Sequence, residues 1–163
     1  MPPAISAVKT RLPDIDMNEI LKKYDEVNNF GKNLGLELEV LRPGKVIYRM
    51  TISKMHLSNP FAAHGGAISG MMDGILGVSA LSLAVESNKL VSTVEYKLNY
   101  FKPIEKGDKL RGVGEVIFEG NRLLTCEGKI YADNKDGMLV CSGIGTFNAY
   151  PAAKNQLFSE YSG

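Results

Sequence analysis

The chain has 163 residues, of which 23% are charged, and its formal net charge at pH 7 is +1. This length predicts a single domain of residues 1–163 that buries about 70% of the surface of its unfolded chain. The balanced charge gives no general reason to expect a nucleic acid or a membrane as partner. Cys126 and Cys141 lie in apolar runs and are expected to be buried free thiols, so nothing demands an oxidising compartment.

Residues 1–13 are expected to form a loose arm, and they lack the apolar run of a signal peptide, so the cytoplasm is the expected location. An amphipathic helix is predicted over 16–34, with Asp14 or Asp16 as its N-cap and Gly35 as its stop. Its apolar residues follow helical spacing: Ile20, Leu21, Tyr24, Val27, Phe30 and Leu34.

A β-hairpin is predicted next. Apolar and charged residues alternate over 36–41, a turn follows at 42–45, and an apolar strand resumes at 46–52. Residues 53–64 are expected to be a loop in which His56 is a solvated histidine.

The most distinctive stretch begins at Asn59 and runs to about Glu86. From 67 to 85 it is almost wholly apolar on all sides, which predicts a helix buried in most directions. Asp73 is the one charge in that run, and a carboxylate there is costly unless it is paired, hydrogen-bonded or reaches a cleft. The helix opens with His64-Gly65-Gly66, where unpaired N–H groups and a partial positive charge are expected. The segment thus offers oxyanion donors at its start and a carboxylate about two turns later, on roughly the same side.

Two other interpretations of this stretch remain open. Its length suits a transmembrane helix, although a central aspartate, five glycines between Gly65 and Gly77 and the lack of a second apolar span argue against one. Asp73 is alternatively a hydrogen-bonded structural residue of a core helix.

Four more strands are predicted at 90–101, 108–119, 122–133 and 138–149, which makes the element order α-ββ-α-ββββ. In the first of them, Val94, Tyr96, Leu98 and Tyr100 share one face, and Thr93 shares the other with Glu95 and Lys97. Glycines inside the later strands indicate bending or close approach of another element: Gly112, Gly114, Gly128, Gly143 and Gly145. The predicted fold class is therefore α+β, with a curved antiparallel sheet wrapped around one long central helix and an extra N-terminal helix.

The pattern Asn59…His64-Gly65-Gly66…Asp73, with the Thr93–Pro103 segment and Gly107-Asp108-x-Leu110, resembles the hotdog-fold acyl-CoA thioesterases. The likeness is closest to the branch of the phenylacetyl-CoA and 4-hydroxybenzoyl-CoA thioesterases. It covers about residues 36–149 and includes the last strand, at 139–147.

The resemblance implies a homodimer, often assembled further into a homotetramer, with the active sites at the dimer interface. It implies hydrolysis of acyl-CoA to free acid and CoA, with no cofactor apart from the coenzyme A of the substrate. Asp73 matches the catalytic carboxylate, acting as general base or nucleophile, and Gly66 the backbone oxyanion donor. His64 and Asn59 match residues that line the reacting centre, and Thr93 a water-holding residue contributed by the partner subunit.

The phosphates of coenzyme A call for cations near the site, and Lys102 and Arg122 are the foremost candidates. The further cationic candidates are Lys97, Lys106, Arg111 and Lys129. Gly65 is expected to let the substrate approach the backbone. The expected acyl pocket is apolar and formed by Met71, Met72, Ile75, Leu76 and Phe61.

Other chemistries find little support. Ser69 and Ser142 lie in no Gly-x-Ser-x-Gly motif, the cysteines and the two histidines lack metal-ligand spacing, and no nucleotide-phosphate fingerprint occurs. Two alternatives to hydrolysis stay open, namely a non-catalytic module that binds acyl-CoA and a hotdog hydratase or dehydratase. The sequence does not distinguish coenzyme A from an acyl carrier protein as donor, or one acyl chain from another.

Overall fold

The computed structural model describes residues 17–152. The predicted arm at 1–13 and the predicted caps Asp14 and Asp16 lie outside the described residues.

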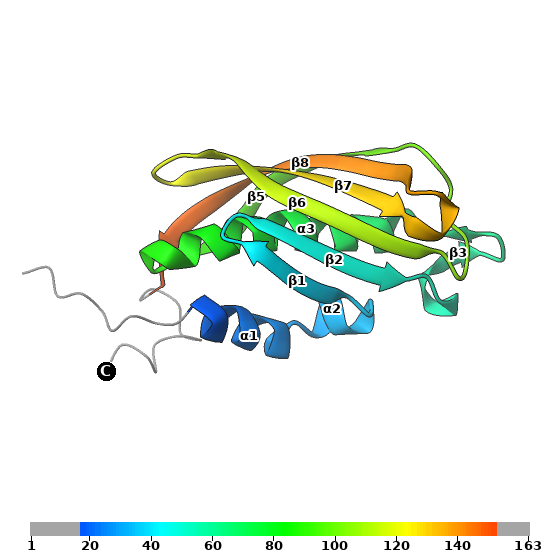
Figure 1. Ribbon diagram of the computed structural model, residues 1–163, viewed down its shortest axis with the longest axis horizontal. Helices are drawn as coiled ribbons and strands as arrows, with labels where there is room; N and C mark the ends of the chain where they lie inside the picture. Colours follow the sequence, from blue (N-terminus) through cyan, green and yellow to red (C-terminus); the bar gives the residue numbers. More distant parts are fainter. Residues whose placement is uncertain (1–16, 153–163) are drawn as a thin grey trace, which may run out of the picture.

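A six-stranded antiparallel sheet forms most of the structure, with strand order β1-β2-β6-β7-β8-β5 (Figure 1). Its strands are β1 (Glu37–Arg42), β2 (Lys45–Thr51), β5 (Lys89–Tyr100), β6 (Lys109–Glu119), β7 (Leu123–Ala132) and β8 (Met138–Pro151). The predicted hairpin and the four later strands are all present, within one or two residues of their expected ends. The edges of this sheet are β1 and β5.

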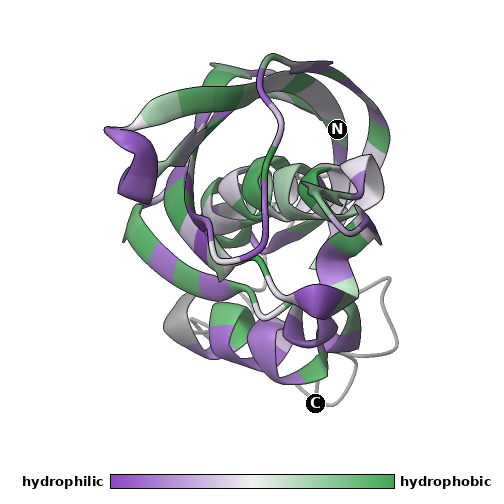
Figure 2. Ribbon diagram, turned by 90° about the vertical axis from the view of Figure 1, so that its right-hand side faces the viewer, coloured by the Kyte–Doolittle hydropathy of each residue, from purple (hydrophilic) through white to green (hydrophobic). Residues whose placement is uncertain are grey.

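The central helix α3 (Gly65–Ala84) lies in the hollow of the curved sheet and continues into a single 3-10 turn, η2 (Val85–Ser87) (Figure 2). Met71, Met72, Ile75 and Leu76 of α3 are fully buried, with 0% exposure. The glycines of the strands make this contact possible. A Cβ added at Gly112 would lie 2.1 Å from the side chain of Ile75. The fold expected from the sequence, a sheet wrapped around one apolar helix, is confirmed.

The segment Gly65–Ser87 is long and apolar enough to cross a membrane, but 67% of its most apolar window is buried inside the fold. Its apolar surface is covered by the sheet on one side and by the N-terminal helices on another (Figure 1). It is the core helix of this domain.

The N-terminal region contains two helices, α1 (Met17–Val27) and α2 (Asn29–Asn33), so the prediction of one continuous helix over 16–34 is wrong. The break falls at Asn28, whose φ and ψ are −75° and 73° and whose side chain accepts a hydrogen bond from the Gly31 N–H. An asparagine side chain competes in this way with the backbone bonds of a helix. The predicted stop at Gly35 fits, because Gly35 adopts a φ of +64°.

The segment predicted as a loop at 53–64 has short elements of its own: η1 (Lys54–His56), β3 (Leu57–Asn59) and β4 (Ala62–Ala63). His56 is 4% exposed, so the expectation of a solvated histidine is wrong. Its Nδ1 accepts the Ser53 N–H at 3.0 Å, and its carbonyl accepts the His64 N–H at 2.7 Å. His56 therefore anchors the loop that leads into α3. A last 3-10 turn, η3 (Asp133–Lys135), joins β7 to β8.

Candidate active site

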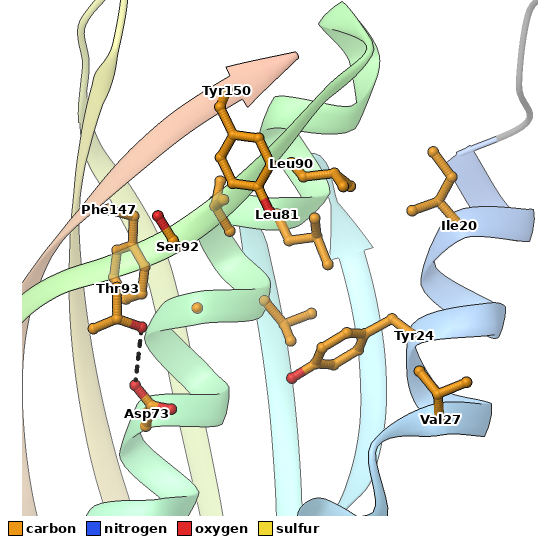
Figure 3. Close-up of a pocket in the computed structure, with 13 residues that line it drawn as sticks. Ile20, Tyr24, Val27, Asp73, Leu81, Leu90, Ser92, Thr93, Phe147 and Tyr150 are labelled. Atoms are coloured by element: carbon orange, nitrogen blue, oxygen red, sulfur yellow. Dashed lines mark hydrogen bonds between the residues drawn. The ribbon is translucent and has the colours of Figure 1, made fainter. Parts of the chain in front are cut away.

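An apolar cavity of about 240 Å³ lies between α1, α3 and the strands β5 and β8 (Figure 3). The polar groups that reach it belong to Asp73, Thr93, Ser92, Tyr24 and Tyr150. Its apolar lining consists of Ile20, Val27, Gly77, Val78, Leu81, Leu90, Val91 and Phe147. In Figure 3 Asp73 and Thr93 lie at one end, and Tyr150 and Leu90 lie at the other. The cavity therefore has the Asp73 carboxylate at one end and a mostly apolar other end, to which Tyr150 adds a hydroxyl.

Asp73 is half-buried on α3, and its Oδ1 accepts a hydrogen bond from the Thr93 hydroxyl at 3.4 Å. Burial raises the pKa of the Asp73 carboxyl above its ordinary value, and the Thr93 hydrogen bond opposes this rise. A carboxylate whose pKa is raised toward neutral pH is a better general base than an ordinary surface aspartate. Asp73 is thus not an ion-paired structural residue, but a carboxylate facing a cavity.

Thr93 contacts the Asp73 of its own chain, and its contribution to the site of a partner subunit stays a prediction. The reason for this contact is a β-bulge between Thr93 and Glu95, where the register with β8 shifts. Thr93 pairs with the buried Phe147 and Glu95 with Thr146, because the extra residue, Val94, interrupts the alternation of faces. Thr93 therefore does not share a face with Glu95.

At the start of α3, His64 is the N-cap, and its Nδ1 accepts the Gly66 N–H at 2.8 Å. The Gly66 N–H, expected to be the oxyanion donor, is therefore engaged by the imidazole in this chain. Because Nδ1 accepts, a neutral His64 carries its proton on Nε2. The residue is exposed, so this N–H is available to a ligand. The Gly65 carbonyl accepts the Tyr100 hydroxyl at 3.1 Å.

Asn59 and Phe61 lie on the β3–β4 turn, outside the cavity that contains Asp73. The Asn59 Oδ1 accepts the N–H groups of Phe61 at 2.9 Å and of Ala62 at 3.1 Å, so it holds this turn together. Phe61 is 80% exposed.

The expected site residues form two groups within the chain. Gly66 and Asp73 are seven residues apart on one helix, which places them about 10 Å apart along its axis. Gly65 and Lys102 line a second hollow of about 390 Å³ at the start of α3. Its other lining residues are Ala62, Ala63, Ile68, Tyr100, Phe101, Pro103, Ile104 and Val140. One thioester carbonyl cannot contact both groups of a single chain.

The cavity is not lined by Met71, Met72, Ile75 or Leu76, which the sequence had offered for the acyl pocket. Met72 faces the strands: a Cβ added at Gly128 would lie 2.6 Å from its sulfur. Sequence reasoning missed Tyr24, Leu81, Leu90 and Tyr150. Helical spacing could have indicated Leu81, because positions 73, 77 and 81 lie on roughly the same side of α3. Positions 72 and 76 lie on a different side of the helix from Asp73.

Lys102 and Arg122 are both exposed, as a contact with phosphate requires. Arg122 lies in the turn between β6 and β7, where its carbonyl accepts the Ala149 N–H at 2.7 Å. Arg111 is a weaker candidate, because it pairs with Asp133 at 3.1 Å and stacks on Tyr131. Within residues 17–152 no group of three or more His, Cys, Asp or Glu side chains is arranged to hold a metal ion.

Comparison with known proteins agrees with the fold. Residues 62–139 match the profile of the thioesterase superfamily. No curated protein sequence matches the chain. A thioesterase family protein from Silicibacter pomeroyi superposes with a TM-score of 0.73 at 25% identity, over 82% of this chain and 97% of that one.

Two further structures are similar at lower identity. The Escherichia coli PaaI protein, from the phenylacetic acid degradation operon, has a TM-score of 0.72 at 16% identity, over 82% of this chain and 93% of that one. A hypothetical thioesterase from Streptococcus pneumoniae, solved with coenzyme A, has a TM-score of 0.62 at 22% identity, over 71% and 86% of the two chains.

The chain thus has the hotdog fold of the thioesterases, and its central part matches the thioesterase superfamily. The resemblance drawn from the sequence is confirmed at this level. The particular branch stays a prediction, because PaaI is only 16% identical and so supports the fold alone.

Proposed function

We propose that this protein hydrolyses acyl-CoA thioesters to a free acid and CoA. The observation that carries the proposal is the Asp73 carboxylate, bonded to Thr93 at one end of an apolar cavity. The cavity offers space for an acyl group, and the carboxylate stands where the thioester of that group would lie. The thioesterase neighbour solved with coenzyme A supports CoA as the leaving group.

In the proposed reaction Asp73 acts as general base. Its Oδ1 accepts the Thr93 hydroxyl, which leaves Oδ2 to accept a proton from water. The water oxygen attacks the thioester carbon, and the negative charge that develops on the carbonyl oxygen needs hydrogen-bond donors. The C–S bond then breaks, and the sulfur leaves as the CoA thiol with the proton that Asp73 took up. Direct attack by Asp73 to form a mixed anhydride is the alternative route.

The donors for that oxyanion are proposed to come from a second copy of the chain. Gly66 and His64 of one chain lie too far along α3 from its own Asp73 to share a carbonyl with it. The long edge strand β5 offers a place for two copies to meet, because a free strand edge presents unpaired N–H and C=O groups. A homodimer joined in this way, and a dimer of dimers beyond it, are proposals for this chain.

Further proposals concern the substrate and its location. Lys102 and Arg122 are the cations proposed to meet the phosphates of coenzyme A. Both cysteines are free and buried, which is compatible with the proposed cytoplasmic location. No resident cofactor is proposed, since CoA belongs to the substrate.

The proposal is tested by following free-thiol release from short-chain, long-chain and aryl acyl-CoAs. Asp73→Asn keeps the shape of the side chain but removes the base, so kcat should fall by about 10²–10⁴-fold. Asp136→Asn is the matched control, because Asp136 is exposed in a surface turn and should leave kcat unchanged. Turnover in Asp73→Asn equal to that of the wild type would remove Asp73 from the mechanism.

One observation favours a second candidate, a module that binds acyl-CoA without hydrolysing it. The Gly66 N–H is already bonded to His64, so this chain does not display a free donor at that position. Such a module would bind acyl-CoA with one ligand per site in calorimetry and release no thiol from any member of the panel.

A further inference from the structure

The N-terminal helix α1 forms the outer wall of the cavity, where Ile20, Tyr24 and Val27 face α3 (Figure 3). Ile20 and Val27 add apolar surface, whereas Tyr24 brings a phenol hydroxyl into the space. In Figure 3 this hydroxyl points toward the end of the cavity that contains Asp73 and away from Leu90 and Tyr150. The charge of Asp73 contributes, after burial, to the raised pKa of Tyr24, so the two groups lie close enough to interact.

The hydrogen bonds of Asn28 show whether the Tyr24 hydroxyl acts as a donor or as an acceptor toward it. The Asn28 Oδ1 accepts the Gly31 N–H at 2.9 Å, and a backbone N–H can only donate. The Asn28 Nδ2 therefore faces Tyr24 and donates to its hydroxyl oxygen at 3.3 Å. The oxygen of Tyr24 is thus the acceptor in this bond, and its own proton is left for another acceptor.

Among the side chains that the structure describes, none accepts this proton, so it is available to a ligand in the cavity. Tyr24 is half-buried, and a ligand that accepts the proton of its hydroxyl is favoured over one that cannot. The acceptor has to lie near Asp73, and hence near the reacting carbonyl, because that is where the hydroxyl points.

The volume of the cavity limits the size of the acyl group that it can hold. An apolar cavity of about 150 Å³ holds one benzene molecule, so the 240 Å³ found here suits about six to ten non-hydrogen atoms. The part of the cavity away from Asp73 is lined by Leu81, Leu90 and Tyr150, and this mostly apolar surface suits a hydrocarbon tail.

We propose that Tyr24 determines acyl specificity and that the preferred substrate is a medium-length acyl-CoA with an oxygen on C2 or C3. That oxygen accepts the Tyr24 proton while the hydrocarbon tail fills the apolar end. The inference rests on the proposed function, since it names the substrate class of the same site. It also assigns a role to α1, namely to complete the acyl cavity.

The test compares kcat/KM for hexanoyl-CoA with that for 2-hydroxyhexanoyl-CoA and 3-hydroxyhexanoyl-CoA. The wild-type protein should prefer one of the hydroxylated substrates by about five- to tenfold, the worth of one neutral hydrogen bond. Tyr24→Phe keeps the ring and removes the hydroxyl, so this ratio should fall to about one. Tyr131→Phe, on the sheet surface where Tyr131 stacks against Arg111, removes a distant phenol and should leave the ratio as in the wild type.

A second variant tests the argument about the proton. Asn28→Asp keeps the acceptor for the Gly31 N–H and replaces the Nδ2 donor with an oxygen. The Tyr24 hydroxyl then donates to that oxygen instead of to the substrate, so the preference should again be lost although Tyr24 is present.

An equal rate for plain and hydroxylated substrates in the wild type, with thiol release intact, overturns the role of Tyr24 and leaves the hydrolase proposal standing. So does a preference that survives Tyr24→Phe. If no acyl-CoA is hydrolysed, the hydrolase proposal fails, and calorimetric Kd values for the same substrates decide the role of Tyr24. An affinity ratio that is the same in the wild type and in Tyr24→Phe then overturns it.

Discussion

Asp73 combines two features that seldom occur together in an ordinary core residue. It lies on a helix whose positions 71, 72, 75 and 76 are fully buried, and yet no described cationic side chain pairs with it. Its contact is a neutral hydroxyl, that of Thr93, and burial dominates its pKa. Such an arrangement leaves the carboxylate basic, whereas an ion pair would lower its pKa.

The raised pKa of Asp73 predicts the acid side of the pH profile. Because the base must be ionised, kcat/KM should fall as the pH decreases through the pKa of Asp73, which lies above the ordinary aspartate value of about 3.9. Thr93→Val removes the hydrogen bond that favours the ionised form, so this fall should move to higher pH. The measurement is a pH profile of kcat/KM for both proteins. A profile that Thr93→Val leaves unmoved would exclude this role for the hydroxyl.

The raised pKa of Asp73 also lowers the free energy of unfolding at neutral pH, where the carboxyl is ionised. The unfolded chain loses the Asp73 proton at lower pH than the folded chain does, so ionisation costs stability above the unfolded pKa and nothing well below it. Asp73→Asn should therefore be more stable than the wild type at pH 7 in urea unfolding. This gain should disappear as the pH falls below the ordinary aspartate pKa.

At the scale of the elements, α3 fits against the sheet because glycines stand where its side chains need room. At Gly114 an added Cβ would lie 2.8 Å from the backbone carbonyl oxygen of Ile75, which cannot move as a side chain can. At Gly74 an added Cβ would meet its nearest neighbour, Leu36, at 3.5 Å, which is an ordinary contact. Close packing therefore requires a glycine at position 114 but not at position 74.

This contrast gives a paired prediction for stability. Gly114→Ala should lower the free energy of unfolding by about 1–3 kcal/mol, since the helix would have to move away from the sheet. Gly74→Ala should be neutral or stabilising, because alanine is favoured over glycine inside a helix by up to about 1 kcal/mol. Urea unfolding of both variants measures the difference. Equal effects would mean that the close approach at Gly114 does not limit the packing.

At the scale of the whole molecule, the two halves of the expected site lie at different places on one chain. Asp73 and Thr93 face the cavity, and His64 and Gly66 cap the far end of α3. The proposed site would therefore be completed by a second chain, and the exposed edge strand β5 is the place proposed for it. Val94, at the bulge of β5, is 57% exposed.

A charge on this edge should separate the subunits. Val94→Lys should convert a dimer to a monomer in light scattering and lower kcat by orders of magnitude, with an unchanged circular dichroism spectrum. Leu41→Lys is the matched control, since Leu41 is 48% exposed on β1, the opposite edge, and should leave both the dimer and kcat intact. If Val94→Lys remains dimeric and Leu41→Lys does not, the subunits meet at the other edge.

The elements and the candidate carboxylate could be predicted from the sequence alone. Alternation and helical spacing are local signals, and they located both hairpin strands, the four later strands, the central helix and Asp73. The strand glycines indicated the close approach of α3 for a physical reason that the structure confirms. The break at Asn28 was missed, because the periodicity of 16–34 continues through it.

What only the tertiary structure decided is which side of each element faces the cavity. The bulge at Val94 turns Thr93 toward Asp73, and the alternation of apolar and polar residues in the sequence did not reveal this bulge. Met72 and Leu81 are equally apolar, but packing buries the first against the strands and leaves the second beside Asp73. Tyr24 lines the cavity only because α1 lies across it from α3, although the two helices are about 50 positions apart in the chain. Apolar periodicity determines which residues are covered, whereas the packing of distant segments determines what covers them and where space is left.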